Sequence, residues 1–266
     1  MLASEGLYMK DNFLRKDIDI LINKPIIEYD LKSANTSLCK YYNLLDKKTI
    51  KKIEMMPKHD RVVTIGKMQR ADKVFKENLK KAFKDIRLKF FKENNIDEND
   101  VLAIKKDAIF MLKPCNYTQF GECNFIPKNE YTSYIYLNRQ LEVYFNRMGV
   151  CDAPPKVDVK GISDISLKKH EGYLLEFLAR LFTHLENGDQ KALFKFINNF
   201  VSKYKHRHLP VGYYREFNNL SIFRVNEWDA TFSDDTFLPF EYPQEHLDID
   251  YNFANVIIPI INLLIR

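Results

Sequence analysis

Glycine is scarce in this sequence, and its scarcity limits the folds that the chain can adopt. Only 8 of the 266 residues are Gly, which is about 3% against a usual ~7%. Rossmann-type and P-loop folds use glycine-rich turns to bring the backbone close to a phosphate. Low glycine therefore disfavours both of these phosphate-binding folds. No serine hydrolase, zincin or Walker A motif is present in the sequence either.

The remaining composition indicates an ordinary globular chain. Hydrophobic residues make up 45% and charged residues 29%, and the formal net charge is +5, which lies far from the disordered class. A charge of this size does not indicate nucleic acid by itself. Its distribution is uneven, however, because residues 47–92 and 203–208 are basic whereas residues 229–250 are acidic.

The sequence predicts an intracellular protein without a membrane partner. No apolar stretch approaches the ~20 residues that a membrane span needs, and residues 1–10 lack the pattern of a secretory signal. The four cysteines show no C-x-x-C spacing, which disfavours a zinc site or a disulfide framework. We expect a reduced, cytoplasmic location, inside the host cell if the chain is viral.

Hydrophobic spacing predicts an α+β fold with two domains. The expected helices cover residues 10–23, 31–45, 66–94, 166–185, 189–204 and 252–264, and the expected strands cover residues 26–30, 101–104, 108–112, 123–126 and 133–145. Residues 226–245 read as a loop, and residues 151–155, which contain two prolines, read as a linker. The first domain, residues 1–150, is expected to hold a small antiparallel sheet with packed helices. The second, residues 151–266, is expected to be mainly helical.

Two aspartates stand where such a sheet could hold a metal ion. Asp30 ends a predicted strand that turns directly into a helix, and Asp107 lies at the tight connection between two predicted strands. Mg²⁺ prefers oxygen ligands and usually binds through one or two carboxylates together with substrate phosphates. Two such ions can stabilise the attacking and leaving oxygens of a phosphoryl transfer. This pair is therefore a candidate site for Mg²⁺ or Mn²⁺.

Three segments resemble the palm domain of family B DNA polymerases. The segment DLKSANTSL at 30–38 resembles polymerase motif A, and KDAIF at 106–110 resembles motif C. The segment VKGI at 159–162 matches a stretch that follows motif C in that family. The order of the predicted elements agrees as well, with a strand, a helix, a long helix, a hairpin and then further helices.

The resemblance implies a fold, an activity and a set of site residues. Residues 1–150 would form a palm and residues 151–266 a thumb, as in a reduced viral or phage polymerase. Asp30 and Asp107 would be the catalytic, metal-binding carboxylates of a template-directed nucleotidyl transferase. Expected contacts to nucleotide or nucleic acid come from Lys67, Arg70, Lys73, Lys106, Lys203, Lys205 and Arg207. The expected partner is nucleic acid, with DNA favoured over RNA, and another polymerase subunit is a further candidate.

The residues leave other interpretations open. Asp30 could cap the following helix, and Asp107 could serve as a turn residue. The basic side chains of the long helix could form a solvated face, and Lys203 and Lys205 could suit a helix C-terminus. Lys106 stands where the family usually carries an acidic residue or threonine, and the fingers motif is missing. A degenerate palm that binds nucleic acid or assembles with other subunits is therefore the alternative function, and an unrelated interaction module is a third.

Overall fold

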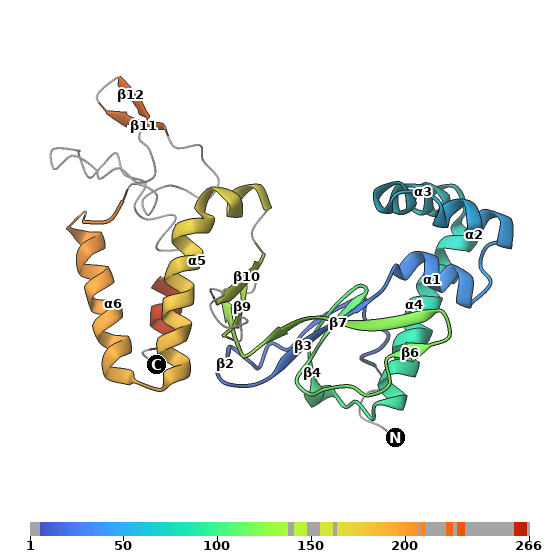
Figure 1. The fold of residues 1–266 in the computed structure, drawn as a ribbon, viewed down its shortest axis with the longest axis horizontal. Coiled ribbons are helices and arrows are strands. Elements are labelled where there is room, and N and C mark those ends of the chain that lie inside the picture. The colour runs from blue at the N-terminus through green and yellow to red at the C-terminus, as the bar shows by residue number, and fades with distance from the viewer. Residues whose placement is uncertain are drawn as a thin grey trace. The chain divides into compact units, whose positions relative to one another are not determined.

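The computed structural model of the chain describes residues 6–137, 141–147, 155–161, 164–206, 208–210, 222–225, 228–231 and 258–264. The chain divides into two compact units (Figure 1). The first unit contains Met1–Asp17 and Pro25–Glu130, and the second contains Ile18–Lys24 and Tyr131–Arg266. Helices and antiparallel sheets together confirm the predicted α+β class. Compactness thus places the main boundary at residues 130–131 and assigns residues 18–24 to the second unit, whereas the sequence-based boundary at 150–151 rests on a linker that contains two prolines.

The first unit is built on a six-stranded sheet with the order β1-β4-β5-β3-β7-β6. Its strands are β1 (Asn12–Leu14), β3 (Ile26–Leu31), β4 (Val101–Lys105), β5 (Ala108–Met111), β6 (Gln119–Phe120) and β7 (Cys123–Tyr131). Strands β4 and β5 form an antiparallel hairpin, and β5 also pairs antiparallel with β3. The predicted hairpin and the strand before it therefore lie side by side.

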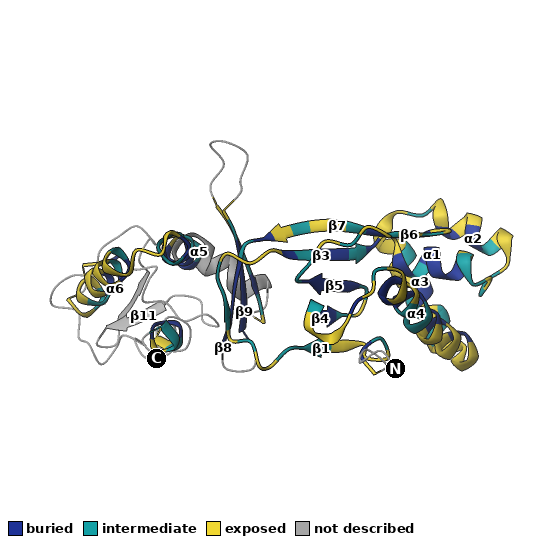
Figure 2. Cartoon of the chain, turned by 90° about the horizontal axis from the view of Figure 1, so that it is seen from below, coloured by how far each residue is buried: buried dark blue, intermediate teal, exposed yellow. Residues whose placement is uncertain are grey.

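Helix α4 (Lys73–Glu93) packs on one face of this sheet. The other helices of the unit are α1 (Ala34–Tyr41), α2 (Lys47–Glu54) and α3 (Lys58–Ala71), which pack on α4 or on one another, and the 3-10 helix η1 (Glu98–Asp100) follows α4. Ile86 and Phe90 of α4 belong to one buried cluster with Tyr29 and Leu31 of β3 and Ile109 of β5. Figure 2 shows this buried layer in dark blue. The apolar face of α4 follows the predicted spacing, and burial of such a face provides most of the stability of a helix.

The long helix predicted over residues 66–94 is two helices in the structure. Asp72 has an extended backbone, and its side chain accepts hydrogen bonds from the N–H groups of Val74 at 2.8 Å and Phe75 at 3.0 Å. Asp is a preferred N-cap residue because it satisfies these first free donors of a helix. This local cap ends α3 and starts α4, which hydrophobic spacing alone does not reveal.

The helix predicted over residues 10–23 is wrong. This segment forms β1, which pairs with β4, and β2 (Ile20–Leu21), which pairs with β8 of the second unit. Each strand completes the edge of a different sheet. Backbone pairing with distant strands therefore overrides the local helical spacing, and such pairing is invisible to a pattern within one segment.

The second unit packs helices on a four-stranded sheet with the order β10-β9-β8-β2. Its further elements are β8 (Ser133–Leu137), β9 (Leu141–Asn146), β10 (Lys156–Lys160), α5 (Asp164–Asn187) and α6 (Gln190–Lys205), and residues 258–264 are helical. The core joins the sheet to α5, where the rings of Phe145 and Phe182 stack with centroids 5.0 Å apart.

Strands β11 (Ile222–Val225) and β12 (Trp228–Thr231) form a hairpin, so the loop expected from residue 226 is wrong over β12. In the part of the chain that the structure describes, no helix has the length and apolarity needed to cross a membrane.

Candidate functional site

Sheet pairing brings Asp30 and Asp107 to the same end of neighbouring strands. Asp30 lies near the end of β3, and Asp107 lies in the two-residue turn that joins β4 to β5. Asp30 stands opposite Ala108, the residue that follows Asp107. The backbone N–H of Leu31 donates to the carbonyl oxygen of Asp107 at 3.0 Å. The two acidic residues that the sequence singled out are therefore neighbours across two paired strands.

Strand alternation places Asp30 on the sheet face opposite α4. Tyr29 and Leu31 belong to the core that β3 shares with α4, and successive side chains of a strand point to opposite faces. Asp30 therefore shares a face with Glu28, which is buried and accepts a hydrogen bond from the side-chain nitrogen of Asn129 at 2.6 Å. Asp30 and Asp107 are both half-buried. The side chains of Asp30 and Glu28 therefore lie on the face of the sheet that α4 does not cover.

The surroundings of Asp30 disfavour its ionised form. Burial raises the pKa of the Asp30 carboxyl above its ordinary value, and the negative charges of Asp107 and Glu28 raise it further. The positive charges of Lys128 and Lys58 act in the opposite direction. Like charges held near one another make ionisation costly. A bound cation would relieve this repulsion, so the electrostatics of the pair fit a divalent metal.

Both connections next to these aspartates contain a residue with left-handed backbone. Ser33, between β3 and α1, has φ 49°, and Lys106, between β4 and β5, has φ 55°. Residues other than glycine adopt this region at a cost, and such residues occur often at functional sites. The scarcity of glycine thus has a structural consequence here, because both turns are made without it.

A buried arginine holds the turn that carries Asp107. Arg87 of α4 is only 2% exposed. Its guanidinium donates to the carbonyl oxygen of Lys106 at 2.8 Å, to that of Tyr8 at 2.8 Å and to that of Lys10. The N–H of Lys106 in turn donates to the carbonyl oxygen of Asp11 at 2.8 Å. The turn is therefore fixed from two sides, and this role of Arg87 was not predicted from the sequence.

The structure separates the alternative interpretations of the two aspartates. Ser33 is the N-cap of α1, and Asp30 lies within β3 three residues earlier, so the interpretation of Asp30 as a helix cap is wrong. Asp107 does occupy a tight turn, as its alternative interpretation holds. A turn position also suits a metal ligand, because it leaves the carboxylate at the end of the sheet.

The cations that act on Asp30 differ from those chosen by sequence. Lys67, Arg70 and Lys73 are exposed and lie at the end of α3 and the start of α4. Lys106 is exposed in the β4–β5 turn. The strongest positive charges on Asp30 come instead from Lys128 of β7 and Lys58 at the start of α3. Lys58 is the last residue of a basic stretch at 47–58, so the sequence could have indicated it as a candidate cation. Lys128 lies near Asp30 only because β7 pairs next to β3 in the sheet, which the sequence does not reveal.

A basic pocket of about 330 Å³ adjoins the turn that follows Asp30. It is lined by Lys32, Ser33, Thr36, Ser37, Lys40, Glu54, Arg61, Gln119, Glu122 and Asn124. Lys40 forms ion pairs with Glu122 at 2.9 Å and with Glu54 at 3.7 Å. The remaining cations of the lining are Lys32 and Arg61. The pocket thus combines positive charge with hydroxyl groups, which suits an anionic ligand.

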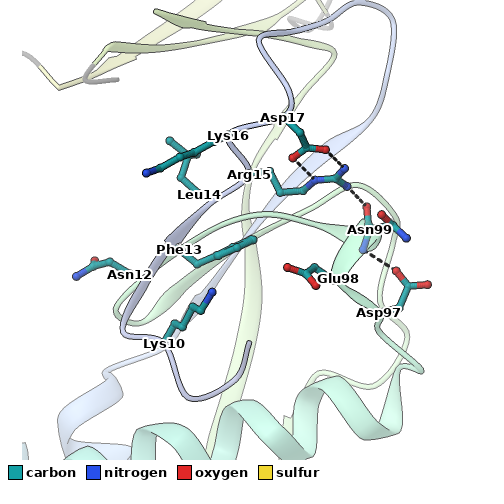
Figure 3. A pocket seen from close by; sticks show the side chains of 10 residues that line it. All are labelled: Lys10, Asn12, Phe13, Leu14, Arg15, Lys16, Asp17, Asp97, Glu98 and Asn99. Atoms are coloured by element: carbon teal, nitrogen blue, oxygen red, sulfur yellow. Dashed lines mark hydrogen bonds and ion pairs between the residues drawn. The ribbon is translucent and has the colours of Figure 1, made fainter. Parts of the chain in front are cut away.

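A larger pocket of about 870 Å³ lies beside the edge strand β1 (Figure 3). Two of its charged groups pair with each other, and two also bond to the backbone. Arg15 pairs with Asp17 and donates to the carbonyl oxygen of Asn99 at 3.0 Å, and the carboxylate of Asp97 accepts from the N–H of Asn99 at 2.6 Å (Figure 3). These bonds shape the chain around β1, and we assign no chemistry to this pocket.

The second predicted basic cluster lies at the end of α6. Lys203 and Lys205 occupy the last turn of this helix and are exposed. Cations at this position interact favourably with the helix dipole, and their contact with phosphate stays a prediction. Arg207 lies outside the residues that the structure describes.

Thiol chemistry is disfavoured in the described part of the chain. Cys39, Cys115 and Cys123 are free cysteines. Burial raises the pKa of Cys39 to about 12 and the pKa values of Cys115 and Cys123 to about 11. Protonated thiols are poor nucleophiles and poor metal ligands. The carboxylates therefore remain the better candidates for chemistry.

The described residues contain no group of three or more His, Cys, Asp or Glu side chains that could hold a metal ion. A site based on Asp30 and Asp107 would therefore hold a metal through two carboxylates, with other ligands from water or substrate. Mg²⁺ is commonly bound in this way beside a phosphate.

Comparison with protein families gives a match over nearly the whole chain. The family described as Bacteriophage PBS1 gene 130 protein matches residues 2–266. No curated protein matches the chain.

Proposed function

Since the chain belongs to the Bacteriophage PBS1 gene 130 protein family, we propose that it acts in the phage-infected cell as a nucleotidyl transferase. In this proposal it extends the 3′ end of a nucleic acid, DNA rather than RNA, on a template. It acts as a minimal polymerase or as one part of a split one. Another subunit would then supply the fingers.

One observation carries the proposal. Asp30 and Asp107 come from separate sequence motifs, yet β3 and the β4–β5 hairpin place them side by side. Two carboxylates carried at adjoining strand ends are what a metal-assisted phosphoryl transfer needs.

The residues of the site divide into two roles. Asp30 and Asp107 would hold Mg²⁺ or Mn²⁺, which would neutralise charge on the transferring phosphoryl group when bound. Lys58 and Lys128, whose charges already act on Asp30, would attract the phosphates of an incoming nucleotide. Lys32 and Arg61 would extend this positive region into the adjoining pocket.

The other predicted cations divide by position. Arg70 is nine residues beyond Arg61 on α3, which corresponds to about 13 Å along a helix, whereas Lys106 lies directly beside Asp107 in the β4–β5 turn. Contact of Lys67, Arg70, Lys73 and Lys106 with nucleic acid stays a prediction. Lys203, Lys205 and Arg207 remain candidates for contact with the backbone of a duplex.

Primer extension tests the proposal. We expect that Asp30→Asn and Asp107→Asn each lower extension of a DNA primer–template in Mg²⁺ or Mn²⁺ by about 100-fold or more, because each removes charge stabilisation at the reacting phosphate. The matched control is Asp60→Asn, which alters an exposed carboxylate of α3 and should leave the rate within about twofold. Full activity in both site variants would rule out the assignment.

The alternative function is a degenerate palm that binds nucleic acid or assembles with polymerase subunits. Lys106 favours it, because a cation occupies the turn position beside Asp107 where the polymerase motif usually has an acid or threonine. In that case the wild-type chain would not extend a primer but would bind a primer–template at low salt, with affinity falling as salt rises. Absence of binding at low salt would exclude the nucleotidyl transferase and the nucleic-acid-binding form of the alternative.

A further inference from the structure

Helix α3 has far fewer buried residues than the neighbouring helix α4. Ile65 is the one buried residue among its fourteen, whereas α4 buries seven residues. Val62 and Val63 of α3 are 56% and 40% exposed. A helix of a globular protein is normally stabilised by an apolar stripe packed against other elements. Helix α3 therefore presents apolar side chains for which the described part of the chain provides no cover.

Helical spacing gathers these side chains on one surface, which we call the outer face of α3. It consists of Val62, Val63, Gly66, Lys67 and Arg70, which recur at intervals of three and four residues. Val63, Lys67 and Arg70 lie on the side of the helix away from the buried side chain of Ile65. Val62, three residues before Ile65, and Gly66, the residue after it, form the border of this face. From residue 62 to residue 70 this face is about 12 Å long, or a little over two turns.

A glycine occupies the middle of the outer face. A Cβ atom added at Gly66 would meet no atom within 4 Å, so packing inside the described chain does not require a glycine here. Glycine in a helix interior is less favourable than alanine, and it is often found where another backbone approaches closely. With only 8 glycines in the whole sequence, this position is a suitable contact point for a second helix.

The charge around the outer face is mainly positive. From Lys58 to Lys73 the chain has five lysines or arginines and two aspartates. One of these aspartates, Asp72, is engaged as the N-cap of α4. A complementary partner would therefore be acidic, and it would need apolar side chains to cover the two valines.

We propose that the outer face of α3 is a docking surface for an acidic amphipathic helix of a partner protein. Its apolar side would cover Val62 and Val63, its backbone would approach at Gly66, and its carboxylates would pair with Lys67 and Arg70. This is the usual way in which an amphipathic helix binds a protein surface. The valines favour protein over nucleic acid, because contacts to nucleic acid are mostly polar bonds to phosphate and sugar.

A peptide titration with the full chain tests the proposal. The probe is a fluorescein-labelled 21-residue designed helix with leucine on one face and glutamate elsewhere, and fluorescence anisotropy measures its affinity. Val63→Asp and Gly66→Leu should each weaken binding about tenfold or more, the first by repulsion and the second by blocking close approach. Leucine is a better helix former than glycine, so Gly66→Leu should keep α3 folded, which circular dichroism checks.

Charge reversal adds a second, opposite readout. The double variant Lys67→Glu/Arg70→Glu should bind the acidic peptide more weakly and should bind a lysine version of the same peptide more tightly. The matched control is Phe194→Asp on α6, because Phe194 is a similarly exposed apolar residue at 45% and its substitution should leave binding unchanged.

Several outcomes would overturn the proposal. One is a wild-type chain that binds the acidic peptide no better than a peptide of the same composition in permuted order. Another is a loss of binding in Phe194→Asp equal to that in Val63→Asp. Binding of a single-stranded DNA oligonucleotide with the same sensitivity to Val63→Asp and Gly66→Leu would assign the face to nucleic acid instead. These outcomes are independent of primer extension, so the docking surface and the proposed activity can fail separately.

Discussion

At the scale of single residues, the environment of Asp30 links its burial to its proposed role. Burial and the nearby carboxylates raise its pKa, so the folded state holds this proton more tightly than the unfolded state does. The associated stability is fully present below the ordinary pKa of 3.8 and is lost as pH rises through the raised pKa of the folded state. Ionised Asp30 therefore destabilises the fold at neutral pH, as is common for functional groups.

The raised pKa of Asp30 predicts how the substitution Asp30→Asn changes the stability of the fold. The variant should unfold at a higher urea concentration than the wild type at pH 7, and the difference should shrink as pH falls to about 3, where the wild-type carboxyl is protonated. Urea titrations of both proteins at the two pH values measure the difference. A variant that is less stable at pH 7, or a difference independent of pH, would contradict this account of Asp30.

Arg87 is the second residue whose environment makes a strong prediction. Arg87→Met would remove the donors to the carbonyl oxygens of Tyr8, Lys10 and Lys106. Each buried acceptor left without a donor costs about 1–3 kcal/mol. Burial also lowers the pKa of Arg87, so removal of its charge regains some desolvation energy.

We therefore expect Arg87→Met to lower the free energy of unfolding by about 2–4 kcal/mol. The control is Arg180→Met, because Arg180 is exposed and pairs with Glu176 at 2.6 Å on one helix. It should change stability by less than about 1 kcal/mol. Equal effects of the two substitutions in urea unfolding would show that Arg87 does not fix the turn.

At the scale of elements, the β4–β5 hairpin shows how local cost and tertiary support combine. Its turn places Lys106 in the left-handed region at φ 55°, although glycine would adopt this conformation at no steric cost. The bonds to Arg87 and Asp11 hold it there. The sequence predicted both strands and the turn between them, but not this backbone conformation, because lysine usually avoids it.

Lys106→Gly should therefore stabilise the protein by up to about 1 kcal/mol, since it removes a left-handed penalty of about 1–2 kcal/mol but gives the unfolded chain more freedom. Lys105→Gly is the matched control, because Lys105 lies within β4, where glycine costs about 0.5–1 kcal/mol. Urea unfolding of both variants is the measurement. Destabilisation by Lys106→Gly would show that its side chain contributes more than its backbone conformation costs.

At the scale of the whole molecule, the residues that the structure describes form two separate hydrophobic cores. One contains Phe90 of α4 and the strands of the first unit, and the other contains Phe182 of α5 and the strands of the second. Both phenylalanines are completely buried. Since the two cores share no residue, local openings of the two units are expected to be separable.

Core substitutions test this separation. Phe90→Leu and Phe182→Leu should each cost about 1–2 kcal/mol, because each removes buried volume. Hydrogen exchange followed by mass spectrometry should then show faster exchange mainly in residues 25–130 for Phe90→Leu and mainly in residues 131–206 for Phe182→Leu. Faster exchange throughout both units in either variant would mean that the units unfold as one.

The sequence by itself determined the elements that local hydrophobic spacing predicts. The amphipathic face of α4, the two helices α5 and α6, the β4–β5 hairpin and the α+β class all follow from hydrophobic spacing, which reports local burial. It also identified Asp30 and Asp107, because residue type and position at strand ends are visible in a single segment.

Only the tertiary structure decided what depends on contacts between distant segments. Residues 10–23 contain two edge strands because their backbone pairs with β4 and with β8. Lys58 and Lys128, rather than Lys67 or Arg70, act most on Asp30, and buried Arg87 secures the turn of Asp107. Backbone pairing and electrostatic interactions join residues that are distant in the sequence. Such contacts leave no pattern within one segment, so the sequence alone does not reveal them. The number of glycines can be counted in the sequence. Only the structure shows that Ser33 and Lys106 adopt left-handed backbone without glycine and that Gly66 lies where no neighbouring atom requires a glycine.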